Sequence, residues 1–583
     1  MFVHFTLFTR WCLLLILCIP VLAGLVGVVF PALGYFPAIG ANAISFEVFT
    51  RFFALDGVWQ MMWLSLFTGL GSTLLAIAGA FLLLAAFYRT ALLGKIQGLL
   101  SPFLVFPHAA AAIALLFALS PSGLFARLTT FGNDVALPAS SSSIFPYDEF
   151  GLSVLFALSL KELPFIILMT LSVMSQPLVQ KKLNGYVQVG NTLGYSHIAS
   201  FFKLVIPPIF AQIRLPILAV LVFATSNVEI PLILGPNNPS TLAVAIMHWF
   251  NHIDLSMRLL ASSAAVVQVA ISAIALLMFF GIELMVKRIG KYSIVKGKRP
   301  MADSLIQGLG FGILVLYVVL ICAVVYTVVT YSFAKHWHYP TLLPEGVTLL
   351  HWSTALSAIA APLINSLILG MLVSTTSLIL VLFALESEQL KPANAFTANA
   401  FSISIFLPLL VPGVAFLYGL VWFQQIVLQN AVWFHTFIAH MVYVLPYVFL
   451  SMAVAYRKFD NRYAWVAQSL GKTPWQVFYY VKLPSMIGAI LVAWALGLAI
   501  SFSQYLPTLL ASGGTIPTVT TEAVASVSGS STRLTAVFVI VQAVMPLVGF
   551  ALAWSSDAFL GEKRGNSVPI VKNEKKKGVL HSA

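Results

Sequence analysis

Apolar residues gather along this chain in long runs that short polar segments separate. A helix of about 20 apolar residues is long enough to cross the hydrocarbon core of a bilayer. Runs of this length occur at residues 11–33, 58–87, 98–122, 151–178, 209–235, 259–286, 306–332, 362–385, 400–423, 431–455, 486–510 and 534–558. The pattern predicts an all-α, polytopic membrane protein with about twelve transmembrane helices.

Composition excludes a soluble protein and changes the meaning of the net charge. Hydrophobic residues make up 60% of the chain and charged residues 8%, whereas a soluble domain carries roughly a quarter charged residues. The formal net charge is +13, but the basic residues are spread over the connections between apolar runs. We therefore expect membrane lipid, and no nucleic acid, as a partner. Cys12, Cys18 and Cys322 lie in apolar runs without metal-ligand spacing, which predicts buried thiols.

The positions of lysine and arginine orient the predicted helices. Alternate connections contain Arg89, Lys95, Lys181, Lys182, Lys203, Lys287, Arg288, Lys291, Lys296, Lys298, Arg299, Lys391, Arg457, Lys458, Arg462, Lys472 and Lys482. Clear of the helix ends, the intervening connections contain Arg51, Arg127 and Lys335. The positive-inside rule then predicts that both termini are cytoplasmic. We expect the first run to be retained as a helix, because no A-x-A-like cleavage site follows it.

A basic connection at residues 287–305 lies near the middle of the chain and predicts a cytoplasmic linker. It separates a first half, residues 1–286, from a second half, residues 306–560. A lysine-rich cytoplasmic tail follows at residues 561–583. The polar composition of this tail predicts disorder.

Two of the predicted inside loops are similar to each other. Residues 186–207 read YVQVGNTLGYSHIASFFKLVIP, and residues 463–484 read YAWVAQSLGKTPWQVFYYVKLP. They align without a gap at an offset of 277 (463 − 186 = 277). The identical pairs are Tyr186 and Tyr463, Val189 and Val466, Leu193 and Leu470, Gly194 and Gly471, Phe201 and Phe478, and Pro207 and Pro484. The alignment predicts an internal duplication, with two homologous halves in parallel topology.

The composition of these loops predicts a helix-turn-helix along the cytoplasmic face. A glycine within a helical pattern marks a turn, which fits Gly194 and Gly471. A proline is tolerated in the first turn of a helix, which fits Pro207 and Pro484 at the start of the next span. A pair of ordinary amphipathic connectors is the alternative interpretation.

Both loops resemble the EAA loop of binding-protein-dependent ABC transporter permeases, whose pattern is roughly E-A-A-x3-G-x9-I-x-L-P. The Gly194-to-Pro207 and Gly471-to-Pro484 spacings match that pattern in both halves. Gln188 and Trp465 stand at the position of the family's glutamate, which puts an ionic contact of that residue in doubt. The two-in-one arrangement is similar to the fused ferric-iron and thiamine permeases.

The resemblance implies the role, the partners and the location of this chain. In that family the loop is a coupling helix that docks into a cleft on a cytoplasmic ATPase subunit. The coupling loops would then be residues 181–208 and 457–485. The matching ATPase-coupling positions are Gln188, Leu193, Gly194, Phe201, Pro207, Trp465, Leu470, Gly471, Phe478 and Pro484. The implied partners are an ABC ATPase subunit in two copies and a periplasmic solute-binding protein, at the bacterial inner (plasma) membrane.

The chain lacks the motif that would let it hydrolyse ATP itself. A phosphate-binding loop needs G-x-x-x-x-G-K-[ST] to wrap backbone amides around phosphates. Residues 471–473 read GKT, but Val466 stands where the first glycine of that motif should be. We therefore expect no cofactor bound by this chain, no catalytic residue, and ATP hydrolysis by a partner subunit.

Polar residues interrupt the apolar run that follows each loop. The same offset pairs Ser226 with Ser503 and Asn227 with Gln504, while Glu229 has no acidic counterpart. A carboxylate within a span is expensive and marks an interior surface. In the resembled family this helix lines the translocation path. The path residues would be Ser226, Asn227, Glu229, Ser501, Ser503 and Gln504. Hydrogen bonding between helices is the alternative role for these side chains.

Two further pairs of polar residues carry weaker signals. Lys161 and Glu162 are adjacent within a span, so on a helix each meets a different partner, and a structural role is favoured. His248 and His252 have the spacing of a helical metal site, but no third ligand is evident nearby. Because a zinc site needs at least three protein ligands, a loop role is favoured and no metal is expected.

Taken together, the sequence predicts the membrane permease subunit of an ATP-driven solute importer. The alternative is an ion-coupled secondary transporter, for which Lys161, Glu162 and Glu229 would be the candidate coupling groups. A membrane-embedded enzyme would need a cluster of His, Asp or Cys at membrane depth, and the sequence offers none. The solute stays open among iron, thiamine, oxyanions and polyamines, with the fused arrangement favouring the first two.

Overall fold

The computed structural model describes residues 1–130, 145–297, 299, 302–390, 395–529 and 531–565. Within these residues ten helices are long and apolar enough to cross a membrane, or up to twelve if each of two bent pairs is one span. The predicted all-α polytopic fold with about twelve spans is confirmed. The described strands, β1 (Ala334–His336) and β2 (Glu345–Val347), pair as one antiparallel hairpin.

The helices of the chain up to residue 295 are α1 (Phe2–Ala32), the 3₁₀ turn η1 (Pro37–Ile39), α2 (Glu47–Phe53), α3 (Val58–Phe87), α4 (Leu92–Val105), α5 (His108–Leu119), α6 (Leu124–Thr130), α7 (Leu152–Met174), α8 (Pro177–Thr192), α9 (His197–Ser200), the π-helix η3 (Phe201–Val205), α10 (Ile206–Thr225), α11 (Glu229–Leu234), α12 (Leu242–Phe250) and α13 (Met257–Val295). The helices beyond it are α14 (Asp303–Phe333), α15 (Leu350–Leu390), α16 (Ala395–Leu410), α17 (Gly413–Val427), α18 (Val432–Arg457), α19 (Arg462–Ser469), α20 (Pro474–Val477), the π-helix η4 (Phe478–Lys482), α21 (Leu483–Ser485), α22 (Ile487–Phe502), α23 (Leu506–Ser512), α24 (Val519–Val527) and α25 (Thr532–Gly565).

Two of the predicted spans are broken by proline. The span predicted at 98–122 divides into α4 and α5 at Pro107, and the span predicted at 400–423 divides into α16 and α17 at Pro412. The two parts of the second break meet at an angle of 100°. Proline has no backbone N–H to donate and disfavours helical geometry in the residue before it, so a long apolar run ends there.

The segment predicted as a linker, residues 287–305, is helical over much of its described length. The helix α13 continues to Val295, and α14 begins at Asp303. The basic residues of this stretch therefore project largely from the end of a long helix. A charged segment can remain helical once it has left the bilayer, because water then solvates its side chains.

The first helix of each part packs on the other part. The buried residues of α1 include Phe2, Leu13 and Leu17, which belong to a core cluster otherwise built from α15, α16, α18, η4 and α22. Conversely, Tyr317 of α14 belongs to a cluster built from α3, α4, α7, α8, η3, α10 and α13. Each part of the chain therefore packs its first helix against the helices of the other part.

Glycines allow the close approach of α1 to α17. A Cβ added at Gly24 would lie 2.2 Å from the carbonyl oxygen of Phe416, and one at Gly27 would lie 2.8 Å from the Cα of Gly419. Small residues let helix backbones approach in a membrane, where packing rather than water exclusion drives association. Substitution of either glycine would force these helices apart.

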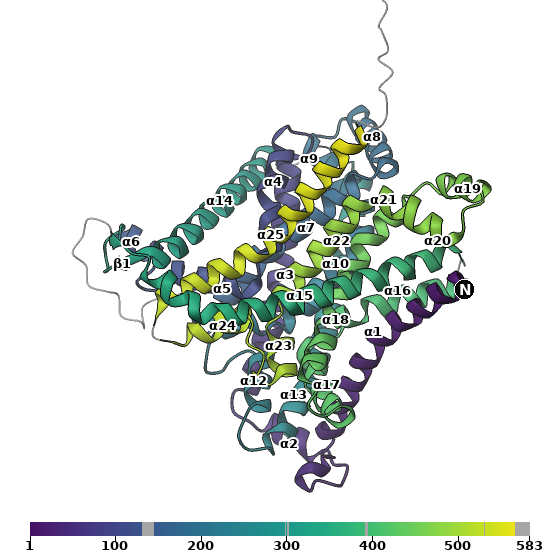
Figure 1. The fold of residues 1–583 in the computed structure, drawn as a ribbon. Coiled ribbons are helices and arrows are strands. Elements are labelled where there is room, and N and C mark those ends of the chain that lie inside the picture. Colours follow the sequence, from purple (N-terminus) through teal and green to yellow (C-terminus); the bar gives the residue numbers. More distant parts are fainter. Residues whose placement is uncertain (131–144, 298, 300–301, 391–394, 530, 566–583) are drawn as a thin grey trace, which may run out of the picture.

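A third core cluster joins the two parts. It draws buried residues from α5, α7, α11 and α12 together with α17, α23, α24 and α25. Figure 1 shows α8 and α9 at the same end of the molecule as α19 and α20, and α2 and α17 at the opposite end. The two loops that are similar in sequence thus lie at one end of a shared bundle.

Candidate functional site

Residues 186–207, here called the first repeat loop, turn at a left-handed glycine. Gly194 has φ +74°, a conformation that glycine adopts without the strain a side chain would bring. The amide of Gly194 donates to the carbonyl oxygen of Asn191 (3.1 Å), and the amide of Tyr195 donates to that of Gly190 (3.0 Å). Ser196 then caps α9, because its hydroxyl accepts from the amide of Ala199 (3.1 Å).

Residues 463–484, the second repeat loop, repeat this turn bond by bond. Gly471 has φ +83°. Its amide donates to the carbonyl oxygen of Gln468 (2.9 Å), and the amide of Lys472 donates to that of Ala467 (3.1 Å). Thr473 caps α20 in a reciprocal capping box with Gln476.

The succession of elements is the same in the two repeat loops. The offset of 277 that aligns the sequences also maps α9 onto α20 (197 + 277 = 474) and η3 onto η4 (201 + 277 = 478). π-Helices are rare and often mark functional segments. Two of them at equivalent positions indicate a geometry that both loops keep in common.

Each repeat loop exposes an apolar stripe on one face of its first helix. In the first loop the stripe consists of Tyr186, Val189 and Leu193, and in the second of Tyr463, Val466 and Leu470. Leu193 is 50% exposed and Leu470 is 75% exposed. The spacing of three and four residues places each set on one helical face. Basic residues flank both stripes, which places them outside the hydrocarbon core, where exposed apolar patches mark interaction surfaces.

The remaining predicted loop residues divide between the surface and the interior. Gln188 and Trp465 are exposed, as are Pro207 and Pro484 in the first turn of α10 and α21. Phe201 and Phe478 are buried instead, at 0% and 1% exposure. These two rings therefore anchor the π-helices to the bundle rather than lie on its surface.

The opposite face of each first helix packs inward through small residues. Gly190 and Ala467 occupy equivalent positions and are both buried. A Cβ added at Gly190 would lie 2.7 Å from Ser200 Oγ and 2.9 Å from Leu204 Cδ1. The first repeat loop thus folds more tightly onto its π-helix than the second.

A buried ion pair fixes the second repeat loop to the bundle. Lys482 Nζ, at the end of η4, donates to Glu386 Oε2 of α15 (2.6 Å) and to Gln389 Oε1 (2.8 Å). The Tyr456 hydroxyl of α18 donates to the same Glu386 oxygen. The Lys482 side chain is 6% exposed and that of Glu386 is 4% exposed. One cation therefore joins three helices away from solvent.

Backbone contacts common to both parts reveal which residues correspond in α3 and α15. Ser65 Oγ accepts from the amide of Leu242 (2.9 Å) at the start of α12, and Ser366 Oγ accepts from the amide of Val519 (3.0 Å) at the start of α24. Residues 242 and 519 are related by the offset of 277, so Ser65 corresponds to Ser366, an offset of 301.

The first repeat loop is held by different contacts. With these offsets, Val205 stands at the position of Lys482 and Ala85 at that of Glu386. His197 Nε2 instead donates to the carbonyl oxygen of Tyr88 (3.1 Å), and the two rings stack with centroids 5.8 Å apart. Apolar packing and separate hydrogen bonds, including one from Ser196 Oγ to Asp303 Oδ1 of α14 (2.9 Å), thus replace the buried ion pair.

The sequence analysis overlooked the role of Lys482. It counted this residue among the basic residues of an inside loop, and Glu386 lay directly after a predicted span. A carboxylate at the edge of an apolar run and a lysine within a strongly apolar segment are both signals of pairing. Their separation of 96 residues hides the partnership from local patterns.

The helix after each repeat loop is interrupted at the same place. α10 ends at Thr225 and α11 begins at Glu229, while α22 ends at Phe502 and α23 begins at Leu506. Both boundaries obey the offset of 277. The interruption that polar residues predict within the spans at 209–235 and 486–510 is therefore present, and these residues bond to the backbone at each break instead of continuing the helix.

Four of the predicted path residues satisfy backbone groups near these breaks. At the first break, Ser226 Oγ donates to the carbonyl oxygen of Val222 (2.9 Å), and Asn227 Oδ1 accepts from the amide of Ile230 (2.9 Å). At the second break, Ser503 Oγ and Gln504 Nε2 both donate to the carbonyl oxygen of Ile500 (2.8 and 3.2 Å). Backbone groups freed by a break within a membrane need such partners.

Ser501 and Glu229 make contacts beyond their own helices. Ser501 Oγ lies 2.9 Å from His440 Nδ1 of α18, and His440 Nε2 lies 2.8 Å from Thr508 Oγ1 of α23. The Glu229 carboxylate lies within electrostatic range of Tyr505, at the break in the other part of the chain. Ile230 and Leu506, which follow these two residues, belong to one core cluster, so the two breaks lie near each other in the bundle.

Glu229 has no cationic partner in the part of the chain that the structure describes. Tyr443 and Tyr505 lie within electrostatic reach of its carboxylate. The groups near the Glu229 carboxylate are thus tyrosine side chains rather than a counter-ion.

Lys161 and Glu162 meet different partners, as their adjacency on a helix predicts. Lys161 Nζ donates to the carbonyl oxygens of Phe103 (2.8 Å) and Leu104 (3.2 Å), near the end of α4. Glu162 Oε1 lies 3.3 Å from His108 Nε2, at the start of α5. Both contacts tie α7 to the helix pair broken at Pro107 and satisfy groups that the break leaves unpaired.

His248 and His252 do not form a metal site within the described residues. His248 lies at the end of α12, and His252 Nδ1 accepts from the amide of Asp254 (3.1 Å) in the loop that follows. No group of three potential metal ligands occurs among the described side chains.

Comparison of the sequence with known proteins finds relatives whose class is named. No protein-family profile matches the chain. The inner membrane ABC transporter permease protein YnjC of Escherichia coli is 28% identical over 409 residues, which cover 70% of this chain and 72% of that protein. The putative 2-aminoethylphosphonate transport system permease protein PhnV of Salmonella typhimurium is 28% identical over 199 residues, 34% of this chain and 74% of that protein. The spermidine/putrescine transport system permease protein PotC homolog of Mycoplasma genitalium is 28% identical over 172 residues, 28% of this chain and 58% of that protein.

Within the described residues, ten to twelve apolar helices with a repeated loop and a repeated helix break make this a polytopic membrane protein. In sequence it is similar to ABC transporter permeases, as the names of these relatives indicate. None of the relatives named here is described as a ferric-iron or thiamine permease, so that narrower resemblance stays a prediction.

Proposed function

We propose that this chain is a two-half permease that forms the translocation path of an ATP-driven importer of the inner membrane. Residues 1–286 and 306–560 act as the two halves, joined by the segment at 287–305. Each half presents one repeat loop to an ABC ATPase subunit, so that one chain engages two copies. ATP is hydrolysed by those subunits, and this chain binds no cofactor of its own.

The observation that carries this proposal is the matched pair of apolar stripes. Tyr186, Val189 and Leu193 correspond one by one to Tyr463, Val466 and Leu470, on helices with the same turn and the same π-helix behind them. Two equal surfaces at one end of a bundle suit two copies of one partner. The match covers 74% of PhnV but only about a third of this chain, which agrees with two permease units in one polypeptide.

The break regions supply the path between the halves. Glu229 of one half lies within electrostatic range of Tyr505 of the other, and the residues beside them share one core cluster, so the halves touch near the point where each helix is interrupted. Rocking of one half against the other would part this contact and open a route, which is alternating access by rigid-body motion. The residues proposed to line the route are Ser226, Asn227, Glu229, Ser501, Ser503 and Gln504.

The charge distribution supports one membrane orientation. Both repeat loops and the end of α13 carry lysine and arginine, so we propose that they and both termini face the cytoplasm. A periplasmic solute-binding protein would then deliver solute to the opposite end, where α2 and α17 lie. The relatives' names point to phosphonate and polyamine systems, so the solute class needs separate evidence.

Affinity purification in mild detergent, with mass spectrometry of co-purifying proteins, tests the proposal. The comparison variant carries Gly194→Arg and Gly471→Arg. Gly40→Arg is the matched control, because Gly40 has a similar left-handed φ of +81°, has nothing within 4 Å, and follows α1 toward the end away from the repeat loops. An ABC ATPase subunit is expected with the native protein and the control, and is expected to be lost from the loop variant.

A different result would replace the proposal with the secondary-transporter alternative. If the native protein purifies without an ATPase and catalyses ion-gradient-driven uptake in liposomes, the repeat loops have another role. Size-exclusion elution of all three proteins separates loss of the partner from loss of the fold.

A further inference from the structure

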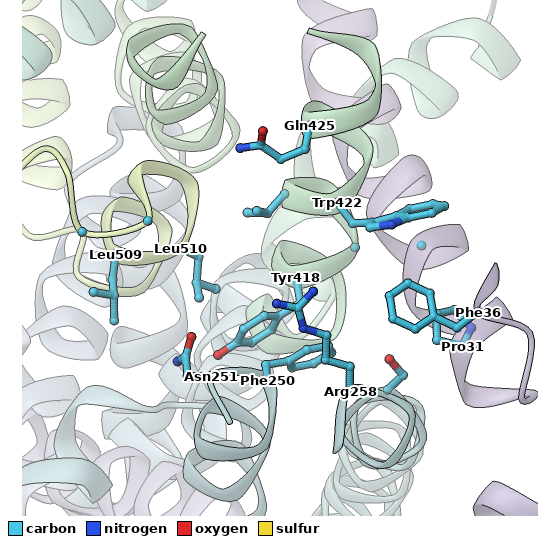
Figure 2. Close-up of a pocket in the computed structure, with 16 residues that line it drawn as sticks. Pro31, Phe36, Phe250, Asn251, Arg258, Tyr418, Trp422, Gln425, Leu509 and Leu510 are labelled. Atoms are coloured by element: carbon cyan, nitrogen blue, oxygen red, sulfur yellow. The ribbon is translucent and has the colours of Figure 1, made fainter. Parts of the chain in front are cut away.

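A cavity of about 520 Å³ opens between the two parts of the chain, at the end away from the repeat loops (Figure 2). Its walls come from the ends of α1, α12, α17 and α23 and the start of α13. Sites for small molecules usually have volumes of about 300 to 1,000 Å³. The cavity therefore has the size of a solute site and lies where both halves contribute to it.

The charge within the cavity is positive. Its lining includes one cationic side chain, Arg258, and no aspartate or glutamate. Arg258 takes part in none of the ion pairs found among the described residues. Figure 2 shows its guanidinium reaching into the cavity beside Tyr418, with the amides of Asn251 and Gln425 on other walls. Guanidinium and amide N–H groups suit a carboxylate or an oxyanion.

A buried hydroxyl without a partner adds an independent sign of a missing ligand. Tyr418 is 9% exposed, and its hydroxyl oxygen is buried with no hydrogen-bond partner. Its ring is fixed by stacking on Phe250, with centroids 3.7 Å apart. An unpaired buried donor is unfavourable. A ligand in the cavity would pair with the Arg258 guanidinium, and a second polar group of the ligand could reach the Tyr418 hydroxyl, which lies on the Asn251 side of the ring.

Aromatic side chains define the other side of the cavity. Trp422 and Phe36 line it, with their ring centroids 6.5 Å apart. Figure 2 shows both rings on the wall away from Leu509 and Leu510. Such a wall favours a ligand with an apolar or ring-containing body next to its charged group.

We propose that this cavity is the site that receives the imported solute, and that the solute is a small organic anion. The inference rests on the proposed transport function and adds the chemical class of its solute. A cationic solute would meet the positive charge of Arg258 without a carboxylate to offset it. Glu229 is not among the residues that line the cavity.

Equilibrium dialysis of the purified full-length chain tests this assignment with three probes of one ring size. Phenylphosphonate is the anion, benzylamine the cation and benzyl alcohol the neutral probe, each measured against empty micelles. Arg51→Gln is the matched control, since it removes an arginine that is paired with Glu47 outside the cavity. Phenylphosphonate should bind the native chain and Arg51→Gln alike. Its affinity should fall about tenfold in Arg258→Gln and about threefold in Tyr418→Phe.

Three results would contradict the assignment of this cavity as an anion site. Tighter binding of benzylamine than of phenylphosphonate, equal affinity in Arg258→Gln, or no binding of phenylphosphonate to the native chain above the micelle blank would each overturn the assignment. Co-purification of the ATPase is a separate measurement, so an anion site that fails leaves the proposed coupling role standing. Loss of the ATPase partner would likewise leave the binding result intact.

Discussion

The two repeat loops present the same backbone and the same exposed stripe but are attached to the bundle by different chemistry. The second is fixed by Lys482 and Glu386, buried with Tyr456 and Gln389. The first has Val205 at the position of Lys482 and is held by packing and by hydrogen bonds of Ser196 and His197. Duplicated segments can thus keep one surface constant while their supports diverge.

The difference in supports predicts a difference in tolerance. A buried ion pair adds little stability when compared with a well-packed apolar pair. Removal of one partner, however, leaves the other charge buried and unpaired, which is strongly destabilising. Apolar packing loses stability more gradually, in proportion to the volume removed. Substitutions behind the second repeat loop should therefore have larger effects than those behind the first.

The largest effect is expected from Lys482→Met. This change leaves the Glu386 carboxylate buried without a cation and should lower the free energy of unfolding by about 3 to 5 kcal/mol. Denaturation in mixed micelles measures the change. Val205→Ala, at the equivalent position of the first repeat loop, is the matched control, and should lose only about 1 kcal/mol.

A double variant sharpens this result. Lys482→Met with Glu386→Leu gives the second repeat loop an apolar support like that of the first. Most of the lost stability should return, because no buried charge is left unpaired. A double variant as unstable as the single one would show that the support depends on charge rather than on packing.

A smaller effect is expected from exchanging the small residues behind the stripes. Gly190→Ala places a Cβ 2.7 Å from Ser200 Oγ and should cost about 1 to 3 kcal/mol. Ala467→Gly at the equivalent position should cost only about 1 kcal/mol, through added backbone freedom. Equal costs at the two positions would contradict the tighter packing of the first repeat loop.

His197→Ala tests a hydrogen bond that holds the first repeat loop on the bundle. It removes the hydrogen bond to the Tyr88 carbonyl oxygen and should lower the free energy of unfolding by about 1 kcal/mol. The same micelle titration detects this change. A loss as large as that of Lys482→Met would mean that the two loops are supported equally strongly.

The smallest effect on folding is expected on the exposed stripes. Leu193→Ser and Leu470→Ser replace exposed side chains and should change the free energy of unfolding by no more than about 0.5 kcal/mol. If the stripes bind the ATPase, each change should still weaken that association, by about tenfold. Unchanged association in both variants would remove the stripes from the interface.

Local features of this fold follow from the sequence. The apolar runs predict the spans, and the offset of 277 predicts that Gly194 and Gly471 occupy equivalent turns. Both glycines adopt the left-handed conformation for which that residue type is suited. The polar residues after Thr225 and Phe502 indicate the breaks, because their side chains compete for backbone groups.

Features that depend on distant contacts were not predictable. Lys482 and Glu386 are separated by 96 residues, and no local pattern connects them. The packing of α1 on α17 depends on close approach at Gly24, Gly27 and Gly419, and that of α14 on α3 depends on Gly310, which becomes visible only in three dimensions. The cavity beside Arg258 likewise arises where the ends of separate helices meet.

Photo-crosslinking from within the repeat loops tests the central claim most directly. A photoreactive amino acid is placed at Leu193 or at Leu470 in cells that contain the whole transporter, with Leu277 on the exposed face of α13 as the control. The account predicts a crosslink to an ABC ATPase subunit from both loop positions and none from Leu277. Absence of that crosslink from both loops, or equal labelling from Leu277, would contradict docking of the ATPase at the repeat loops.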